Sequence, residues 1–166
     1  MITVDDILKC KKIIDKKRRP ELQLEHRHYR MNIELTCNEL DVKMIMFIRK
    51  LAESPNKDFT VGLRIAGPSF FANHDTVIVR FQGPHGGQSA ARNLSDLHNN
   101  YHMHLYTEDD RIHHRKLAKY KEAATFNSFE QAVVDFLAFC NIEDPNGIFD
   151  YELELTQQFK MDLENL

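Results

Sequence analysis

The sequence contains no tryptophan, only three cysteines, and no apolar run that approaches the length of a membrane span. The cysteines (Cys10, Cys37 and Cys140) are widely scattered and form no CxxC pair, which excludes a disulfide framework and indicates small buried side chains in a reducing compartment. A bilayer span needs about 18 to 20 apolar residues, so we expect no membrane partner. The first residues, MITVDDILKCKK, lack the basic and apolar regions of a secretory signal. We therefore expect a cytoplasmic location.

The length and composition are those of one ordinary globular domain. The chain has 166 residues, of which 42% are apolar and 28% are charged. No internal repeat and no Pro/Ser-rich linker divides it, and a chain of this length leaves little room for two cores. We predict a single domain over residues 1–166, with a helical, basic N-terminal segment (1–28), a sheet core (29–155) and a C-terminal tail (156–166).

Charge is distributed unevenly along the chain. The formal net charge is −3, which argues against long-range capture of nucleic acid by the whole molecule. The stretch from Lys9 to Arg30 is nevertheless basic, with nine lysines and arginines against three acids. Such a segment either follows the phosphates of a nucleic acid or forms the solvated face of the first helix and the loop after it.

Three segments show helical patterns. Thr3, Thr36 and Ser128 each stand three residues before an acidic or amide side chain, which is the spacing of a helix N-cap. Apolar residues then recur at intervals of three and four. We predict helices over residues 4–17, 38–53 and 128–140.

Other segments alternate between apolar and polar residues, which is the pattern of half-buried strands. They are HYRMNIELT, DFTVGLRIA, DTVIVRFQG, YHMHLY and IFDYELELT. In the strand DTVIVRFQG, we expect Val77, Val79 and Phe81 on one face. The pattern of residues 111–126 fits both helix and loop. Short loops and the lack of a βαβ rhythm predict an α+β fold: an antiparallel sheet of about five strands with three helices packed mainly on one face.

The stretch NNYHMHLYTEDD, residues 99–110, carries the clearest chemical signal. In an extended strand it would place His102, His104 and Tyr106 on one face and the alternating apolar side chains on the other. One face would belong to the core, while the other would carry functional groups.

Further polar groups flank this strand. Arg80 stands near the end of the preceding strand, His85 follows it on a glycine-flanked turn, and Asp96 and His98 lead into the histidine strand. If the two strands pair, these groups meet at one end of a hairpin. We expect His85, His102 and His104 to gather in one surface cleft with Arg80 at its edge.

The motifs RFQGPH, YHMHLY and SFEQAVVDFLAFCNI together resemble an uncharacterised bacterial family, a domain of unknown function. That family has an arginine at a strand end, a Gly-Pro-His turn, a His-x-His-x-Tyr strand and an FxxxCNI helix. The pattern is also similar to small toxins of toxin–antitoxin modules. The resemblance implies a bacterial or phage conflict setting, either toxin–antitoxin or defence and anti-defence, and defines no reaction.

Three functions fit these residues. The favoured one is binding without catalysis, of a protein or a nucleic acid (RNA rather than DNA), with His102 and His104 on the solvated face of the sheet. The second is a cofactor-free ribonuclease in which one histidine deprotonates the ribose 2′-OH, another protonates the leaving 5′-oxygen, and Arg80 stabilises the transition state. Its catalytic candidates are His85, His102, His104, Arg80 and Tyr106. The third is a zinc protein with the ligands His85, His98, His102 and His104.

Overall fold

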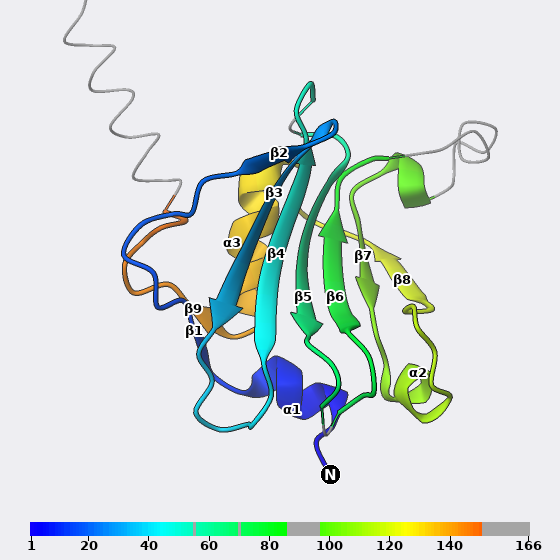
Figure 1. The fold of residues 1–166 in the computed structure, drawn as a ribbon. Coiled ribbons are helices and arrows are strands. Elements are labelled where there is room, and N and C mark those ends of the chain that lie inside the picture. Colours follow the sequence, from blue (N-terminus) through cyan, green and yellow to red (C-terminus); the bar gives the residue numbers. More distant parts are fainter. Residues whose placement is uncertain (55, 70, 86–96, 151–166) are drawn as a thin grey trace, which may run out of the picture.

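A computed structural model describes residues 1–166 except 55, 70, 86–96 and 151–166. Its main feature is a seven-stranded sheet in which every strand pairs antiparallel with its sequence neighbour, in the order β2-β3-β4-β5-β6-β7-β8 (Figure 1). The strands are β2 (Gln23–Glu25), β3 (His28–Leu35), β4 (Met44–Leu51), β5 (Phe59–Ile65), β6 (Thr76–Gln82), β7 (His102–Leu105) and β8 (Tyr120–Ala123). The fold is therefore α+β, as predicted, with a larger sheet than the five strands expected.

The helices are few and short. Among the described residues they are α1 (Val4–Lys9), α2 (Glu108–Ile112) and α3 (Phe129–Phe139), and a 3-10 turn, η2 (Leu97–Asn99), precedes β7. Helix α3 lies behind the sheet and α1 lies across one end of it (Figure 1). The N-cap predicted for α3 is present, because the Ser128 side chain accepts a hydrogen bond from the Gln131 backbone N–H. Only one face of the sheet is thus covered by a long helix of the described chain.

The core lies between α3 and the sheet. Alternate residues of β3, β4 and β5 point into it, and the buried side chains of α3 (Phe129, Ala132, Val133 and Phe136) pack against them. Phe81 of β6 contacts Phe136 with ring centroids 5.4 Å apart. On the face of the sheet that packs against α3 the side chains are apolar and buried, and the burial of apolar surface is the main stabilising contribution to such a fold.

The predicted helix over residues 38–53 is wrong, because the segment contains β4. Met44, Met46 and Ile48 are buried in alternation. Phe47 fits a helical spacing with Met44 and Ile48, but it lies on the opposite face of the strand. Thr36 caps no helix; its backbone exchanges hydrogen bonds with Ile13 instead.

The predicted helix over residues 4–17 is also wrong in extent. The Thr3–Asp6 capping box is present, but α1 ends at Lys9 and the chain continues into β1 (Lys12–Ile13), which pairs parallel with β9 (Ile142–Glu143). The cause is the buried Lys12, whose ammonium group donates to the carbonyls of Leu8, Cys10 and Cys140 at 3.2, 2.8 and 2.7 Å. Beyond α1, the basic N-terminal segment therefore consists of loops and short strands rather than helix.

The predicted face of β6 holds for Val79 and Phe81 but is wrong for Val77. The register with β5 shifts between Leu63 and Arg64, and this bulge turns Ile78 into the core and Val77 to the other side.

The segment 111–126 contains the end of α2 and then β8. The last predicted strand, 148–156, and the tail fall mostly outside the described residues; Ile148 and Phe149 are buried in a turn. No described helix has the length and apolar character to cross a membrane.

Candidate functional site

The face of the sheet opposite α3, here called the open face, presents two rows of residues from adjacent strands. The first row is Arg30, Arg49, Thr60, Gln82, His102 and Ala123. The second row is Asn32, Phe47, Gly62, Arg80, His104 and Lys121. Each row runs directly across the hydrogen-bonded strands, so polar groups that are distant in sequence become neighbours.

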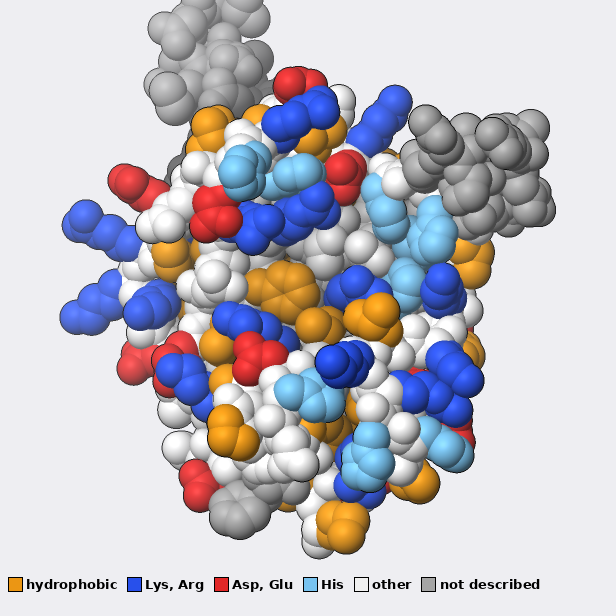
Figure 2. All heavy atoms as spheres, turned by 45° about the vertical axis from the view of Figure 1, so that its right-hand side comes forward, with side chains coloured by type: hydrophobic (Ala, Val, Ile, Leu, Met, Phe, Trp, Pro, Cys, Tyr) orange, Lys and Arg blue, Asp and Glu red, His pale blue; other side chains and the backbone are white. Residues whose placement is uncertain are grey.

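Four histidines meet at the end of these rows near β7. We call His85, His98, His102 and His104 the histidine cluster. Figure 2 shows pale-blue histidine side chains gathered on this part of the surface. Ring centroids lie 5.0 Å apart for His85–His102, 5.1 Å for His85–His98, for His98–His102 and for His102–His104, and 5.9 Å for His98–His104. His85 therefore gathers with the two strand histidines as predicted, and His98 joins them, but His102 and His104 are buried rather than set in a surface cleft.

The local backbone explains why the cluster forms. The alternation of β7 places His102 and His104 on the same face, opposite Gln82 and Arg80 of β6. The chain leaving β6 then turns so that the His85 backbone N–H donates to the carbonyl of His98 at 2.9 Å. This hydrogen bond holds the residues on the two sides of the connection next to each other.

The strand histidines are buried, although the binding interpretation placed them on a solvated face. His102 is 0% exposed and His104 is 5% exposed. Three of their ring nitrogens, His102 Nε2 and both nitrogens of His104, have no hydrogen-bond partner among the described residues. Buried polar atoms normally have partners, so these nitrogens call for a specific explanation, such as a bound ion.

Two rings of the cluster are oriented by backbone carbonyls. His85 Nδ1 lies 2.8 Å from the Gly83 oxygen, and His102 Nδ1 lies 2.8 Å from the Asn100 oxygen. Because a carbonyl only accepts, each Nδ1 carries a proton, and in the neutral form of the ring the lone pair is on Nε2. Histidines that bind metals usually have this arrangement, with the outer N–H bonded to a carbonyl or carboxylate.

The nitrogens of His85, His98 and His102 are close enough to share one ion. One ligand atom from each lies within 4.8 Å of the other two. Around a tetrahedral zinc ion with Zn–N distances of about 2.05 Å, nitrogens lie about 3.3 Å apart, so binding would draw the three nitrogens closer together by at most about 1.5 Å. His104 stands outside this group of three, although it contacts two of its members.

Burial keeps the strand histidines neutral. It lowers the pKa of His102 to about 4, with a smaller lowering by His85 and His98 and a partial offset from the Asn100 carbonyl. Burial, followed by the positive charge of Arg80, lowers the pKa of His104 to about 3. Both rings are therefore uncharged at neutral pH, which is the form that binds metal ions.

Of the remaining predicted site residues, Arg80 adjoins the cluster and Tyr106 contacts another part of the chain. Arg80 lies beside His104 in the second row, half-buried, and within the described chain its guanidinium has no ion pair or hydrogen bond. Burial lowers its pKa. Tyr106 is buried away from the cluster and donates its hydroxyl proton to the carbonyl of Arg115 at 2.9 Å. Asp96 lies outside the described residues.

The structure also shows a polar region that sequence reasoning missed. A hollow of about 480 Å³ lies in the middle of the open face, and its lining includes Arg30, Arg49, Arg64, Arg80 and Phe47 but no acidic residue. We call it the arginine hollow. Phe47 and Arg49 lie in the segment predicted to be helical, so the sequence analysis did not place them on the sheet. The alternating pattern of β4 was the signal that could have placed them there.

Comparisons with known proteins find no matching family model, no matching curated protein and no matching solved structure.

Proposed function

We propose that the histidine cluster is a transition-metal centre, with zinc as the preferred ion, held by Nε2 of His85 and His102 and by His98. The observation that carries this proposal is the buried Nε2 of His102, which has no hydrogen-bond partner among the described residues and belongs to a group of three histidines close enough to share one ion. Imidazole nitrogen is among the ligands that zinc prefers. Three histidines leave one coordination position for water or substrate, which is the pattern of catalytic zinc sites.

Burial disfavours His102 and His104 as the general acid of a metal-free ribonuclease. That mechanism needs one protonated histidine to donate to the leaving oxygen. The lowered pKa values of His102 and His104 leave both rings neutral at pH 7. A neutral histidine can act as a base or a ligand, but it has no acidic proton of the required strength.

A zinc ion bound here would act as a Lewis acid toward an oxygen of the substrate. The chain would contribute the rest: the Gly83 and Asn100 carbonyls orient two ligands, and Arg80 places a positive charge beside His104. This combination suits metal-assisted hydrolysis of an anionic substrate. The family resemblance adds a bacterial or phage conflict system as the setting for such an activity.

The test is a calorimetric titration of metal-free protein with Zn²⁺, with Ni²⁺ and Mg²⁺ as comparisons. We expect one zinc ion per chain, weaker or comparable binding of Ni²⁺, and no binding of Mg²⁺, which prefers oxygen ligands. His85→Ala should abolish tight binding. His85 is partly exposed on a turn, so this variant keeps the core intact.

Two further variants make the titration decisive. His102→Asn removes the buried ligand, and its fold is checked by circular dichroism. His113→Ala, at the exposed end of α2, is the matched control and should bind zinc like the wild type. If the wild type does not bind zinc, or if the control loses binding as strongly as His85→Ala, the proposal is wrong.

A further inference from the structure

The arginine hollow is lined by one arginine from each of four strands. Its four arginines come from four consecutive strands, β3 to β6, and Arg30 lies directly opposite Arg49. Like charges directly opposite each other destabilise a sheet. A protein that keeps them together, without a carboxylate in the lining, has a surface suited to an anion.

Three of the arginines are partly neutralised at the rim. Arg30 pairs with Glu25 at 3.1 Å, Arg49 with Asp58 at 3.3 Å, and Arg64 with Asp75 at 2.7 Å. Arg80 differs, because its half-buried guanidinium meets no carboxylate of the described chain. An unpaired, partly desolvated charge costs stability, and a bound phosphate would satisfy it with charge-assisted hydrogen bonds.

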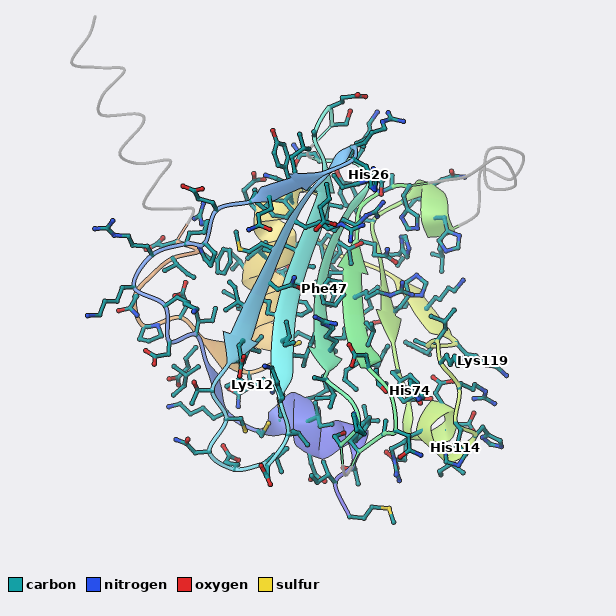
Figure 3. All side chains as sticks on the ribbon, viewed as in Figure 1. Lys12, His26, Phe47, His74, His114 and Lys119 are labelled. Atoms are coloured by element: carbon teal, nitrogen blue, oxygen red, sulfur yellow. The ribbon has the colours of Figure 1, made fainter. Side chains whose placement is uncertain are left out.

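The floor of the hollow carries an aromatic ring. Phe47 lies half-buried in the middle of the sheet (Figure 3), with its ring tip over Gly62, its partner on β5. A Cβ atom on Gly62 would come within 2.3 Å of Phe47 Cζ, so the glycine makes room for the ring. An aromatic ring beside unpaired positive charge is the pattern of surfaces that bind single strands.

We infer that the arginine hollow binds a single-stranded nucleic acid, with a base stacked on Phe47 and a phosphate held by Arg80. Single strands fit better than duplexes, because only an unpaired strand exposes the face of a base. A volume of about 480 Å³ is enough for one nucleotide and not for a duplex.

This inference deepens the proposed function, since it names the substrate class of the same site. Arg80 and His104 are cross-strand neighbours, so a phosphate at Arg80 would lie next to the histidine cluster. Lys121 follows His104 in the second row and would continue the basic path beyond the cluster. A strand laid along this row would pass the proposed metal centre.

The experiment measures fluorescence anisotropy of a labelled 12-nucleotide RNA with metal-free protein in the presence of chelator. We expect saturable binding that weakens as salt rises, because phosphate contacts release counterions. A single-stranded DNA should bind within about tenfold of the RNA, whereas a duplex should bind far less. Inorganic phosphate and a nucleoside monophosphate are the competitors that distinguish a strand site from a simple phosphate site.

Variants test the two contacts separately. Arg80→Met should lower affinity at least about tenfold, and Phe47→Ala should lower it about five- to 150-fold, the range for losing one stacked base. The control is Lys16→Ala/Lys17→Ala, which removes two positive charges from the basic N-terminal segment away from the hollow. It should change affinity less than about threefold.

The possible results separate this inference from the proposed function. RNA binding in chelator that depends on Arg80 and Phe47 supports the inference whether or not zinc binds. The inference is overturned if no strand binds, if phosphate alone competes as well as the strand, or if only the lysine variant loses affinity. Zinc binding without RNA binding would support the metal centre and overturn the inference that its substrate is a single-stranded nucleic acid.

Discussion

Arg80 and His104 face each other across β6 and β7, on the face of the sheet opposite α3. Among the described residues, Arg80 is a half-buried cation without a carboxylate partner, and neither ring nitrogen of the buried His104 has a hydrogen-bond partner. Neither side chain stabilises the fold by a hydrogen bond to the other. Arg80 lines the arginine hollow and His104 belongs to the histidine cluster, so the pair connects the two regions. A functional role is the simplest explanation for this pair of side chains.

Arg80→Met should therefore leave the free energy of unfolding within about 0.5 kcal/mol of the wild type or raise it. The variant removes a partly desolvated charge and keeps the apolar part of the side chain. Equilibrium urea unfolding measures the change. A loss of more than about 1 kcal/mol would give Arg80 a structural role and weaken the case for an anion partner.

Gly62→Ala should lower the free energy of unfolding by about 1 to 3 kcal/mol, because the new methyl group would overlap the Phe47 ring. The same substitution in a Phe47→Ala background should cost less than about 0.5 kcal/mol, since the ring is gone. A double-mutant cycle by thermal unfolding gives the coupling between the two sites. Equal costs in both backgrounds would mean that the ring does not lie over Gly62.

Lys12→Met should destabilise the protein by about 3 kcal/mol, because the Cys10 and Cys140 carbonyls lose a charged donor in a buried place. Lys12 lies on β1, near the end of the sheet where α1 packs (Figure 3). Lys11→Met is the matched control. Its exposed ion pair with Glu143 is worth less than about 1 kcal/mol. If the two variants are equally stable, the ammonium group does not hold these segments together.

Asp110 should make the protein sensitive to acid. Burial alone would raise the pKa of its carboxyl group, but hydrogen bonds from Thr107, Arg115 and the Lys119 backbone N–H lower it below the ordinary value of 3.8. The unfolded chain then takes up the proton first as the pH falls. The stabilisation is complete above about pH 5 and is lost as the pH falls below about 4.

Asp110→Asn should consequently be less stable than the wild type at pH 7 and lose less further stability between about pH 5 and pH 2. Asp5→Asn, on the exposed surface of α1, makes the same change in net charge and serves as the control. Urea unfolding across this pH range measures both slopes. An Asp110→Asn slope as steep as that of the wild type would contradict the assignment.

The strands with clean alternation could be predicted from the sequence, as could the meeting of His85 with His102. The helix over residues 38–53 could not be rejected, because Met44, Phe47 and Ile48 fit a helical period as well as a strand. Because the segment of β4 was predicted to be helical, the position of Phe47 beside Gly62 could not be predicted. The rows of the open face also depend on register across six strands, which short-range patterns do not determine.

The burial of His102 and His104 likewise depends on contacts outside their own strand. The alternation of β7 predicted their common face, but not that the turn at His85 and the turn η2 would remove them from solvent. Long-range packing sets both the burial and the lowered pKa values. The predicted metal ligands could therefore be named from the sequence, while the reason to favour metal over acid–base chemistry could not.

The measurement that tests the metal centre most directly is X-ray absorption spectroscopy of the protein after loading with one equivalent of zinc and removal of unbound ions by gel filtration. We expect retained zinc with three imidazole ligands and one oxygen ligand at about 2.0 Å. His85→Ala should lose the metal or one imidazole from its shell. A wild-type protein that emerges without zinc, or with a shell of oxygen atoms and fewer than two imidazoles, would contradict the account.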